Sequence, residues 1–209
     1  MENIKVLENP LVKHKIGIIR NKETSTKEFR EIISELSTCL CYEALSDAKL
    51  TEEVIDTPIC QTTVQKLNEK DYAFVPILRA GTGMLDGLIH IMPNAQIGHI
   101  GLYRDPKTLK PVEYYYKMPE NIQNREAIIL DPMLATGGSS CATIAKLKAD
   151  GVKKIKFLCI IACPEGIEKI NKEHPDVKIY TCSIDERLNE IGYIVPGLGD
   201  AGDRIFGTK

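Results

Sequence analysis

The segment from Ile128 to Ser140, IILDPMLATGGSS, joins an acid to a turn rich in glycine and hydroxyl residues. Its apolar start predicts a strand that ends at Asp131, and residues 141–150 have the pattern of a helix. The amides of such a turn and the positive end of the helix bind phosphate, and Thr136 and Ser139 add hydroxyl donors. A carboxylate beside an anion site is explained if it contacts sugar hydroxyls or a metal ion. The segment therefore predicts a site for a phosphorylated sugar.

Charged residues also follow other predicted strands. Arg79 comes after the apolar run 72–78, and Arg104 comes after the run 96–103. Ligands of open α/β sheets bind beyond the carboxyl ends of the strands, so we expect Arg79, Arg104 and Asp131 to line one crevice. A single charged residue at a strand end is common, because strands end where the chain leaves the core. Two arginines and an aspartate at three such ends favour a ligand site over that explanation. Arginine would clamp a diphosphate there, and the carboxylate would anchor a sugar.

A sheet flanked by helices is needed to bring these side chains together. The hydrophobic pattern predicts strands at 72–78, 96–103, 112–117, 127–130, 155–162 and 177–183, and helices over 25–48, 84–91, 141–150 and 164–173. A short strand is expected at 57–62, and residues 1–24 are expected to form a mixed arm that could reach a neighbouring subunit. Strands that alternate with helices predict an α/β fold with a mostly parallel sheet. No boundary divides the chain, so we expect one domain over residues 1–209.

The composition narrows the functional classes. A net charge of −2 gives no reason to expect non-specific nucleic-acid binding, so phosphate recognition must be local. No apolar run approaches the roughly 20 residues of a membrane span, and the start does not resemble a signal peptide. Seven cysteines without a C-x-x-C pair indicate reduced thiols in a cytoplasmic protein. We expect no membrane and no nucleic-acid partner.

Two glycine patterns imitate dinucleotide-binding motifs. Residues 197–202 match G-x-G-x-x-G, but only seven residues follow, too few for a helix, a strand and a ribose-binding acid. Gly81, Gly83 and Gly87 follow a predicted strand, but the next strand ends at Arg104 and not at an acid. The opening segment also lacks the lysine of a P-loop. A dinucleotide site and a P-loop kinase are therefore both disfavoured.

Residues 104–119, RDPKTLKPVEYYYKMP, have two interpretations. The prolines and lysines before a tyrosine-rich strand are typical of a mobile hairpin or lid that closes over a charged substrate and excludes water. The same pattern fits an exposed hairpin whose tyrosines pack on the sheet or on another subunit. The sequence leaves both open.

Three motifs resemble those of the uracil phosphoribosyltransferase family. LDPMLATGGS is similar to its motif for phosphoribosyl diphosphate (PRPP), PILRAG to its diphosphate loop, and YIVPGLGDAGDRIFGT to its uracil-binding segment. Their order and spacing fit the bacterial type over essentially the whole chain. The resemblance implies a type I phosphoribosyltransferase core with residues 184–209 as a hood over the base. It also implies an enzyme that makes UMP and diphosphate from uracil and PRPP.

The resemblance assigns roles to matching positions. Arg79, Arg104 and Asp131 would be catalytic and would contact PRPP. The remaining PRPP contacts would be Pro132, Met133, Leu134, Ala135, Thr136, Gly137, Gly138, Ser139 and Asp200. Uracil would be bound by Ile194, Gly199, Asp200 and Ala201.

A metal ion, an oligomer and an effector are implied in the same way. Many type I enzymes carry two adjacent acids where this chain has Asp131 and Pro132. With one carboxylate, we expect Mg²⁺ to be held mainly by PRPP oxygens and water, with no assigned side-chain ligand. The resemblance also implies a homodimer or higher homo-oligomer, and GTP activates some members of the family.

The expected chemistry is the loss of diphosphate from C1 of the ribose, which leaves positive charge on the sugar. Arg79, Arg104 and magnesium would stabilise the leaving group, and the phosphate loop would orient the ribose. No general base is evident near the base site. We therefore hypothesise that electrostatics, positioning and a lid suffice, and that backbone groups of residues 194–201 select uracil over cytosine.

Three rival classes remain for comparison. An RNA-binding regulator of pyrimidine genes on the same fold would need a basic face, against which the net charge argues. An enzyme for a purine base would lack the uracil-type hood. A structural module with an inert site would not bind PRPP.

Overall fold

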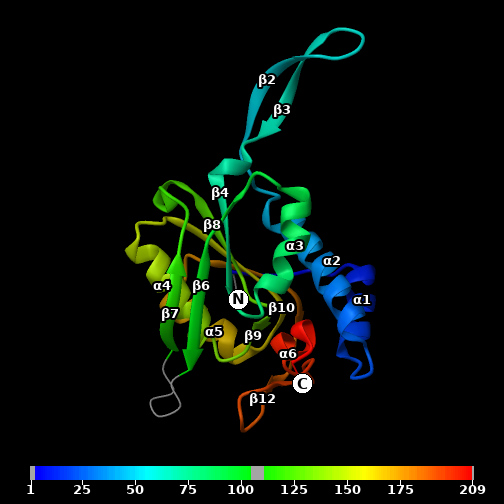
Figure 1. Ribbon diagram of the computed structural model, residues 1–209, viewed down its shortest axis with the longest axis vertical. Helices are drawn as coiled ribbons and strands as arrows, with labels where there is room; N and C mark the ends of the chain where they lie inside the picture. The colour runs from blue at the N-terminus through cyan, green and yellow to red at the C-terminus, as the bar shows by residue number, and fades with distance from the viewer. Residues whose placement is uncertain (1–2, 105–110, 209) are drawn as a thin grey trace.

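The computed structural model describes residues 3–104 and 111–208, without the side chains of Arg104 and Pro111 (Figure 1). Its central sheet has the strand order β1-β11-β10-β8-β4-β6-β7, with short strands β5 on β4 and β9 on β10. Every pair in it is parallel except β6 with β7. The strands are β1 Ile4–Val6, β4 Tyr72–Leu78, β5 Gln96–Ile97, β6 His99–Arg104, β7 Pro111–Lys117, β8 Glu126–Leu130, β9 Met133–Leu134, β10 Lys154–Ala162 and β11 Lys178–Ile184.

Helices cover both faces of this sheet, as Figure 1 shows. One face carries α1 Pro10–Arg20, α2 Thr26–Ala44 and α3 Thr82–Ile91, and the other carries α4 Gly138–Ala149 and α5 Pro164–Glu173. Two apolar clusters fill the two interfaces. The predicted α/β class with a mainly parallel sheet is therefore confirmed.

The longest helix, α2, shows how sequence produces an element. The Ser25 side chain accepts a hydrogen bond from the Glu28 amide at 3.2 Å and caps the helix start. Phe29, Ile33 and Leu36 recur at helical spacing and are fully buried. The helix ends at Ala44, before the predicted end at residue 48, because the chain turns there toward a strand.

Strands β8 and β10 are buried on both faces. Residues 155–162 of β10 are all buried, including Phe157 and Ile160 without exposed surface. Burial of each such side chain stabilises the fold by about 1.5–3 kcal/mol. These central strands form a rigid platform whose carboxyl ends carry the predicted site.

Two predictions about the N-terminal part are wrong. Within the mixed arm predicted over residues 1–24, residues 4–20 belong to the body of the fold instead, because β1 pairs with β11 at the sheet edge and α1 packs its apolar side into the core. A strand was predicted at 57–62, but residues 57–60 are the turn of an antiparallel hairpin and only residues 61 and 62 lie in a strand. The hairpin is made by β2 Leu50–Asp56 and β3 Gln61–Leu67. This hairpin projects from the body in Figure 1. Both faces are largely exposed, so the strands lack the apolar alternation by which strands are recognised.

The other predicted elements are present with small changes in their bounds. The run 96–103 is interrupted at Gly98, which separates β5 from β6. The remaining segment forms β12 Arg187–Leu188, β13 Ile194–Val195 and α6 Ala201–Phe206, close to the carboxyl ends of the sheet strands (Figure 1). In the described part of the chain, no helix is long and apolar enough to cross a membrane.

Candidate active site

The loop after β8 is fixed by the neighbouring strand β10. The Pro132 carbonyl accepts hydrogen bonds from the amides of Ile160 and Ile161 at 3.0 and 3.1 Å, and Leu134 accepts one from Cys163 at 3.1 Å. Leu134 is fully buried in the core, so only its backbone can face a ligand. The loop that carries Asp131 is therefore held on the sheet by its own backbone.

The turn continues into the start of α4. Gly137 has a φ of +72°, which an L side chain adopts only with strain, and it directly precedes the helix. Close to it, a Cβ on Gly166 of α5 would lie 2.4 Å from the Ala135 carbonyl oxygen. The first-turn amides of a helix have no partners within the helix, so this turn and the start of α4 have a backbone geometry that suits an anion.

A second loop, after β4, brings Arg79 to the same edge. A Cβ on Gly81 would lie 2.2 Å from the carbonyl oxygen of Leu130, the residue before Asp131, so only glycine permits this approach of the two loops. The Arg79 guanidinium lies 3.4 Å from an Asp203 carboxylate oxygen and 5.7 Å from the centre of the Phe206 ring. Arg79 thus lies between the phosphate loop and α6.

The hood, residues 184–208, forms the opposite wall. Asp200 caps α6 by accepting a hydrogen bond from the Asp203 amide at 2.9 Å. Ile194 is buried, with its backbone in the two-stranded pair with Leu188. On this wall, the small residues Gly199 and Ala201 leave their backbone groups accessible beside the Asp200 carboxylate.

Two arginines fasten the hood to the body. Arg20, at the end of α1, donates to both carboxylate oxygens of Asp185 at 2.5 and 2.8 Å and to the Gly197 carbonyl at 2.7 Å. Asp185 in turn accepts from the Gly197 amide at 2.9 Å. Arg204 donates to the carbonyls of Leu198 and Asn21 at 2.8 and 2.7 Å. Asp185 follows β11, but it positions the hood and does not line the site.

Asp131 has a different electrostatic environment. Burial raises the pKa of its carboxyl to about 7, and the Met133 amide, 3.4 Å from it, lowers that pKa only partly. Within the described residues, Asp131 forms no ion pair. A partly buried acid without a cation is the arrangement expected of a group that meets its partner on a ligand.

A cavity of about 270 Å³ lies between the two walls. Six predicted site residues line it: Asp131, Pro132, Met133, Gly199, Asp200 and Ala201. Four lining residues were not predicted: Ala80, Gly192, Tyr193 and Gly202. Gly192 and Tyr193 belong to an irregular turn before β13, and only the tyrosine ring carries a chemical signal that the sequence could have offered.

The remaining predicted residues lie beside the cavity or outside the described part. Residues 135–139 follow its lining residues along the loop, and Arg79 lies next to Ala80 and Gly202. The Arg104 side chain and residues 105–110 of the predicted lid are outside the described residues. The described part of that segment, β7, pairs with β6 as a hairpin strand.

Comparisons with known proteins identify the family of this chain. A family profile described as uracil phosphoribosyltransferase matches residues 6–208. The uracil phosphoribosyltransferase of Dictyoglomus thermophilum is 58% identical over 204 residues, covering 98% of this chain and 99% of that protein. A structure of a protein from Aquifex aeolicus is 42% identical and superimposes with a TM-score of 0.92 over 99% of both chains.

A more distant likeness concerns the fold alone. The adenine phosphoribosyl transferase of Trypanosoma brucei is 13% identical, with a TM-score of 0.61 over 88% of this chain and 84% of that one. The profile match and the full-length identity are decisive for the family. The chain belongs to the uracil phosphoribosyltransferase family.

Proposed function

We propose that this protein transfers the phosphoribosyl group of PRPP to uracil, giving UMP and diphosphate. The observation that carries the proposal is the cavity that places Asp131, after a strand and before a phosphate-binding turn, opposite Gly199 and Asp200 of the hood. One wall suits a phosphorylated ribose and the other suits a flat base. The two substrates would therefore meet between the walls.

The residues of the first wall act on PRPP. The turn and the start of α4 hold the 5′-phosphate through backbone amides, and the Asp131 carboxylate accepts hydrogen bonds from ribose hydroxyls. Arg79 stabilises the negative charge that develops on the departing diphosphate, and Arg104 has the same proposed role. Together they hold C1 of the ribose in one place while its bond to diphosphate breaks.

Magnesium is part of the proposal. Asp131 and Asp200 present carboxylate oxygens on the two walls, and such oxygens are suitable ligands for Mg²⁺. Because Pro132 replaces a second adjacent acid, most ligands would come from PRPP and water. When bound, the ion supplies positive charge that offsets the charge of the diphosphate.

Uracil binds to the second wall by its polar edge. Backbone groups between Ile194 and Ala201 match its N3–H donor and its neighbouring carbonyl acceptor. Cytosine presents the reverse pattern and would leave buried groups unpaired, at about 1–3 kcal/mol each. The N1 proton of uracil passes to solvent or to PRPP, because no dedicated base is assigned.

We also propose a homodimer or larger homo-oligomer, with GTP as an effector to be tested. The β2–β3 hairpin supports association, because it projects from the body with Val54 62% and Ile59 94% exposed. Light scattering of the wild type and of Val54→Lys/Ile59→Lys measures the assembly. A monomeric wild type would contradict this part of the proposal.

The decisive experiment detects UMP made from uracil, PRPP and Mg²⁺, with and without GTP. Cytosine, hypoxanthine and adenine serve as competing bases. UMP formation that uracil alone supports is the expected result. No UMP from a sample that binds PRPP would contradict the proposal, and preference for a purine would favour a sister enzyme.

A further inference from the structure

Three side chains of metal-binding type meet on the face of the sheet that carries α4 and α5. They are Cys141, the fourth residue of α4, Glu173, the last residue of α5, and His174, which directly follows α5. The Cys141 sulfur, a carboxylate oxygen of Glu173 and a ring nitrogen of His174 all lie within 4.8 Å of one another. In the part of the chain that the structure describes, this is the one such group. Its three residues lie outside the lining of the candidate active site.

The backbone holds two of these residues in place. The Cys141 amide donates to the Gly137 carbonyl at 2.9 Å, and the His174 amide donates to the Ile170 carbonyl at 2.7 Å. Both side chains are buried, with 4% of Cys141 and 9% of His174 exposed. Glu173 is exposed, so its carboxylate can move toward the other two groups. Two fixed ligands and one mobile ligand can close around an ion without a change of the backbone.

The spacing of the three groups is close to that of a tetrahedral zinc site. Zinc bonds of about 2.0–2.3 Å place neighbouring ligand atoms roughly 3.3–3.8 Å apart. The three atoms lie at most 4.8 Å apart. Rotation of the exposed Glu173 side chain and small movements of the other two, of about 1 Å, would bring the atoms to bonding positions.

The Cys141 thiol is not an activated nucleophile. Burial, followed by the charge of Glu173 and a hydrogen bond to it, raises the pKa of this thiol to about 12, and Lys169 lowers that pKa only partly. The thiol is therefore protonated at neutral pH, whereas a nucleophilic cysteine must be a thiolate. A metal ion can still bind the sulfur, because it replaces the proton.

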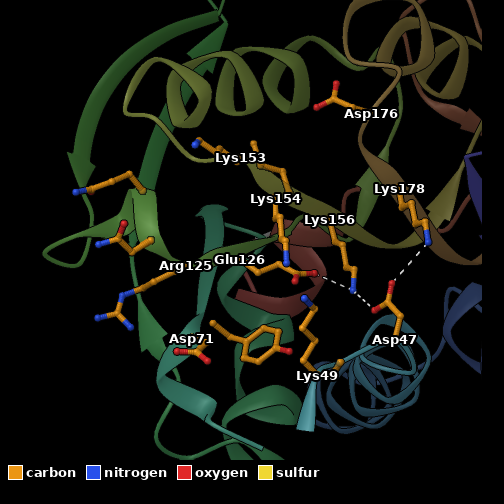
Figure 2. Close-up of a pocket in the computed structure, with 15 residues that line it drawn as sticks. Asp47, Lys49, Asp71, Arg125, Glu126, Lys153, Lys154, Lys156, Asp176 and Lys178 are labelled. Carbon is orange, nitrogen blue, oxygen red and sulfur yellow. Dashed lines mark hydrogen bonds and ion pairs between the residues drawn. The ribbon is translucent and has the colours of Figure 1, made fainter. Parts of the chain in front are cut away.

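The His174 imidazole is oriented by groups of α4. Its Nε2 lies 3.2 Å from the Cys141 carbonyl oxygen, and its Nδ1 lies 3.5 Å from the Lys148 ammonium. An ammonium only donates, so in the neutral ring Nδ1 carries the lone pair and Nε2–H donates to the carbonyl. Metal-binding histidines commonly make such a bond with their second ring nitrogen. Asp176, labelled in Figure 2, lies 2.6 Å from the Lys148 ammonium and would retain it when a metal ion takes its place at the ring.

We propose that Cys141, Glu173 and His174 bind one Zn²⁺ ion between α4 and α5. A thiolate, an imidazole and a carboxylate form a donor set that suits zinc, whereas Mg²⁺ prefers oxygen ligands alone. Water supplies the fourth ligand from the solvent side, where Glu173 is exposed. On binding, the S–H bond breaks, a Zn–S bond forms and the proton passes to solvent. Zinc binding here is independent of the reaction proposed for the active site.

Cobalt(II) serves as a spectroscopic probe of this site in place of zinc. The reduced full-length protein is freed of metal with a chelator and titrated with Co²⁺. A near-ultraviolet thiolate-to-cobalt charge-transfer band and intense visible bands of tetrahedral cobalt are expected, with saturation at one ion per chain. Zn²⁺ should remove these bands, because zinc binds such sites more tightly than cobalt, and millimolar Mg²⁺ should leave them unchanged.

Substitutions then assign the ligands. Cys141→Ser should abolish the charge-transfer band, whereas the control Cys60→Ser, at an exposed cysteine in the turn of the β2–β3 hairpin, should keep it. Glu173→Gln should raise the Kd for Zn²⁺ at least about tenfold. Glu168→Gln, at another exposed acid of α5, makes the same change in charge and should leave the Kd unchanged. Because Glu173 is exposed, its variant tests the site even if Cys141→Ser is unstable.

Three results would overturn the proposal. One is the absence of a charge-transfer band at an excess of Co²⁺. Another is a band that persists in Cys141→Ser or disappears in Cys60→Ser, because other thiols would then hold the ion. The third is displacement of Co²⁺ by Mg²⁺ as readily as by Zn²⁺, which would indicate an unselective carboxylate site.

Discussion

Strand β8 begins at Glu126 and leads directly to Asp131, so one strand carries an acid at each edge of the sheet. Glu126 lies 2.8 Å from the buried Lys156 ammonium. Asp131 has no ion pair in the described chain, and burial raises its pKa to about 7. The difference separates a carboxylate that a lysine of the protein neutralises from one that is left without such a partner, as the proposed role of Asp131 requires.

The same contrast appears at the carboxyl edge alone. Asp185 follows β11 as Asp131 follows β8, and only 1% of the Asp185 side chain is exposed. Burial raises its pKa, but hydrogen bonds from Arg20 and the Gly197 amide outweigh burial and lower it. Position at a strand end therefore does not identify a ligand-binding acid. The two acids differ in that Arg20 neutralises Asp185, whereas no cation of the described residues neutralises Asp131.

The largest expected difference is in catalysis. Asp131→Asn should lower kcat/KM for PRPP at least about 100-fold, because the amide loses the charge and acceptor strength that orient the ribose. Glu126→Gln should change it less than about threefold, since that acid faces the other edge of the sheet. Steady-state kinetics at pH 8 measures both. Full activity in Asp131→Asn would contradict the proposed role of Asp131 in binding PRPP.

Next in size is the structural pair at the hood. Arg20→Met leaves Asp185 buried without its cation and should lower the free energy of unfolding by about 3–5 kcal/mol. Urea denaturation measures the change. Arg187→Met is the control, because the Arg187 side chain is 62% exposed and its one ion pair with a described residue is to the adjacent Glu186. An equal decrease in the free energy of unfolding of both variants would show that the Arg20–Asp185 pair stabilises the protein no more than an exposed ion pair does.

Lys156→Met should have a somewhat smaller effect, about 2–3 kcal/mol of destabilisation. It leaves Glu126 partly buried without a cation, while Asp47 is half exposed and can be solvated. Adding Glu126→Gln should restore much of the stability, because it removes the unpaired charge. A double variant no more stable than the single one would indicate lost packing instead.

The smallest expected effect has the opposite sign. Asp131→Asn should stabilise the protein at pH 8 by on the order of 2 kcal/mol, because it removes a buried charge. The folded pKa of about 7 lies above the unfolded value of about 3.8, so wild-type stability falls as pH rises from about 4 to 7. The gain should therefore nearly vanish at pH 4. Thermal unfolding of both proteins from pH 4 to pH 8 measures this difference in stability. A gain that does not change with pH would contradict the pKa assigned to Asp131.

The main sheet could be predicted because its strands are buried. β4 matches the predicted run 72–78, and α5 matches 164–173, since apolar runs and a proline start are local signals. The β2–β3 hairpin could not be predicted, because its exposed strands have no core to impose alternation. The place of β1 beside β11 depends on pairing across most of the chain, which no local pattern records.

The site was predictable where chemistry is concentrated in one segment. The Asp131 loop and the Gly199–Ala201 turn carry their residue types together, and both line the cavity. Tyr193 was missed because its role depends on how the hood folds back. The lack of an ion pair at Asp131, among the described residues, was equally hidden, because no local pattern shows that Arg20 pairs with Asp185 and that Arg79 lies beside Asp203.

The anchoring of the hood to α1 also bears on how the chain folds during synthesis. Strand β1 and helix α1 leave the ribosome before their partners, which are β11, Asp185 and the carbonyl of Gly197. Their polar groups must therefore wait for segments about 170 residues later in the chain. Contacts of such long sequence separation slow folding. The hood and the N-terminal elements can thus be completed only together, and a nascent protein would contain the Asp131 loop well before its hood.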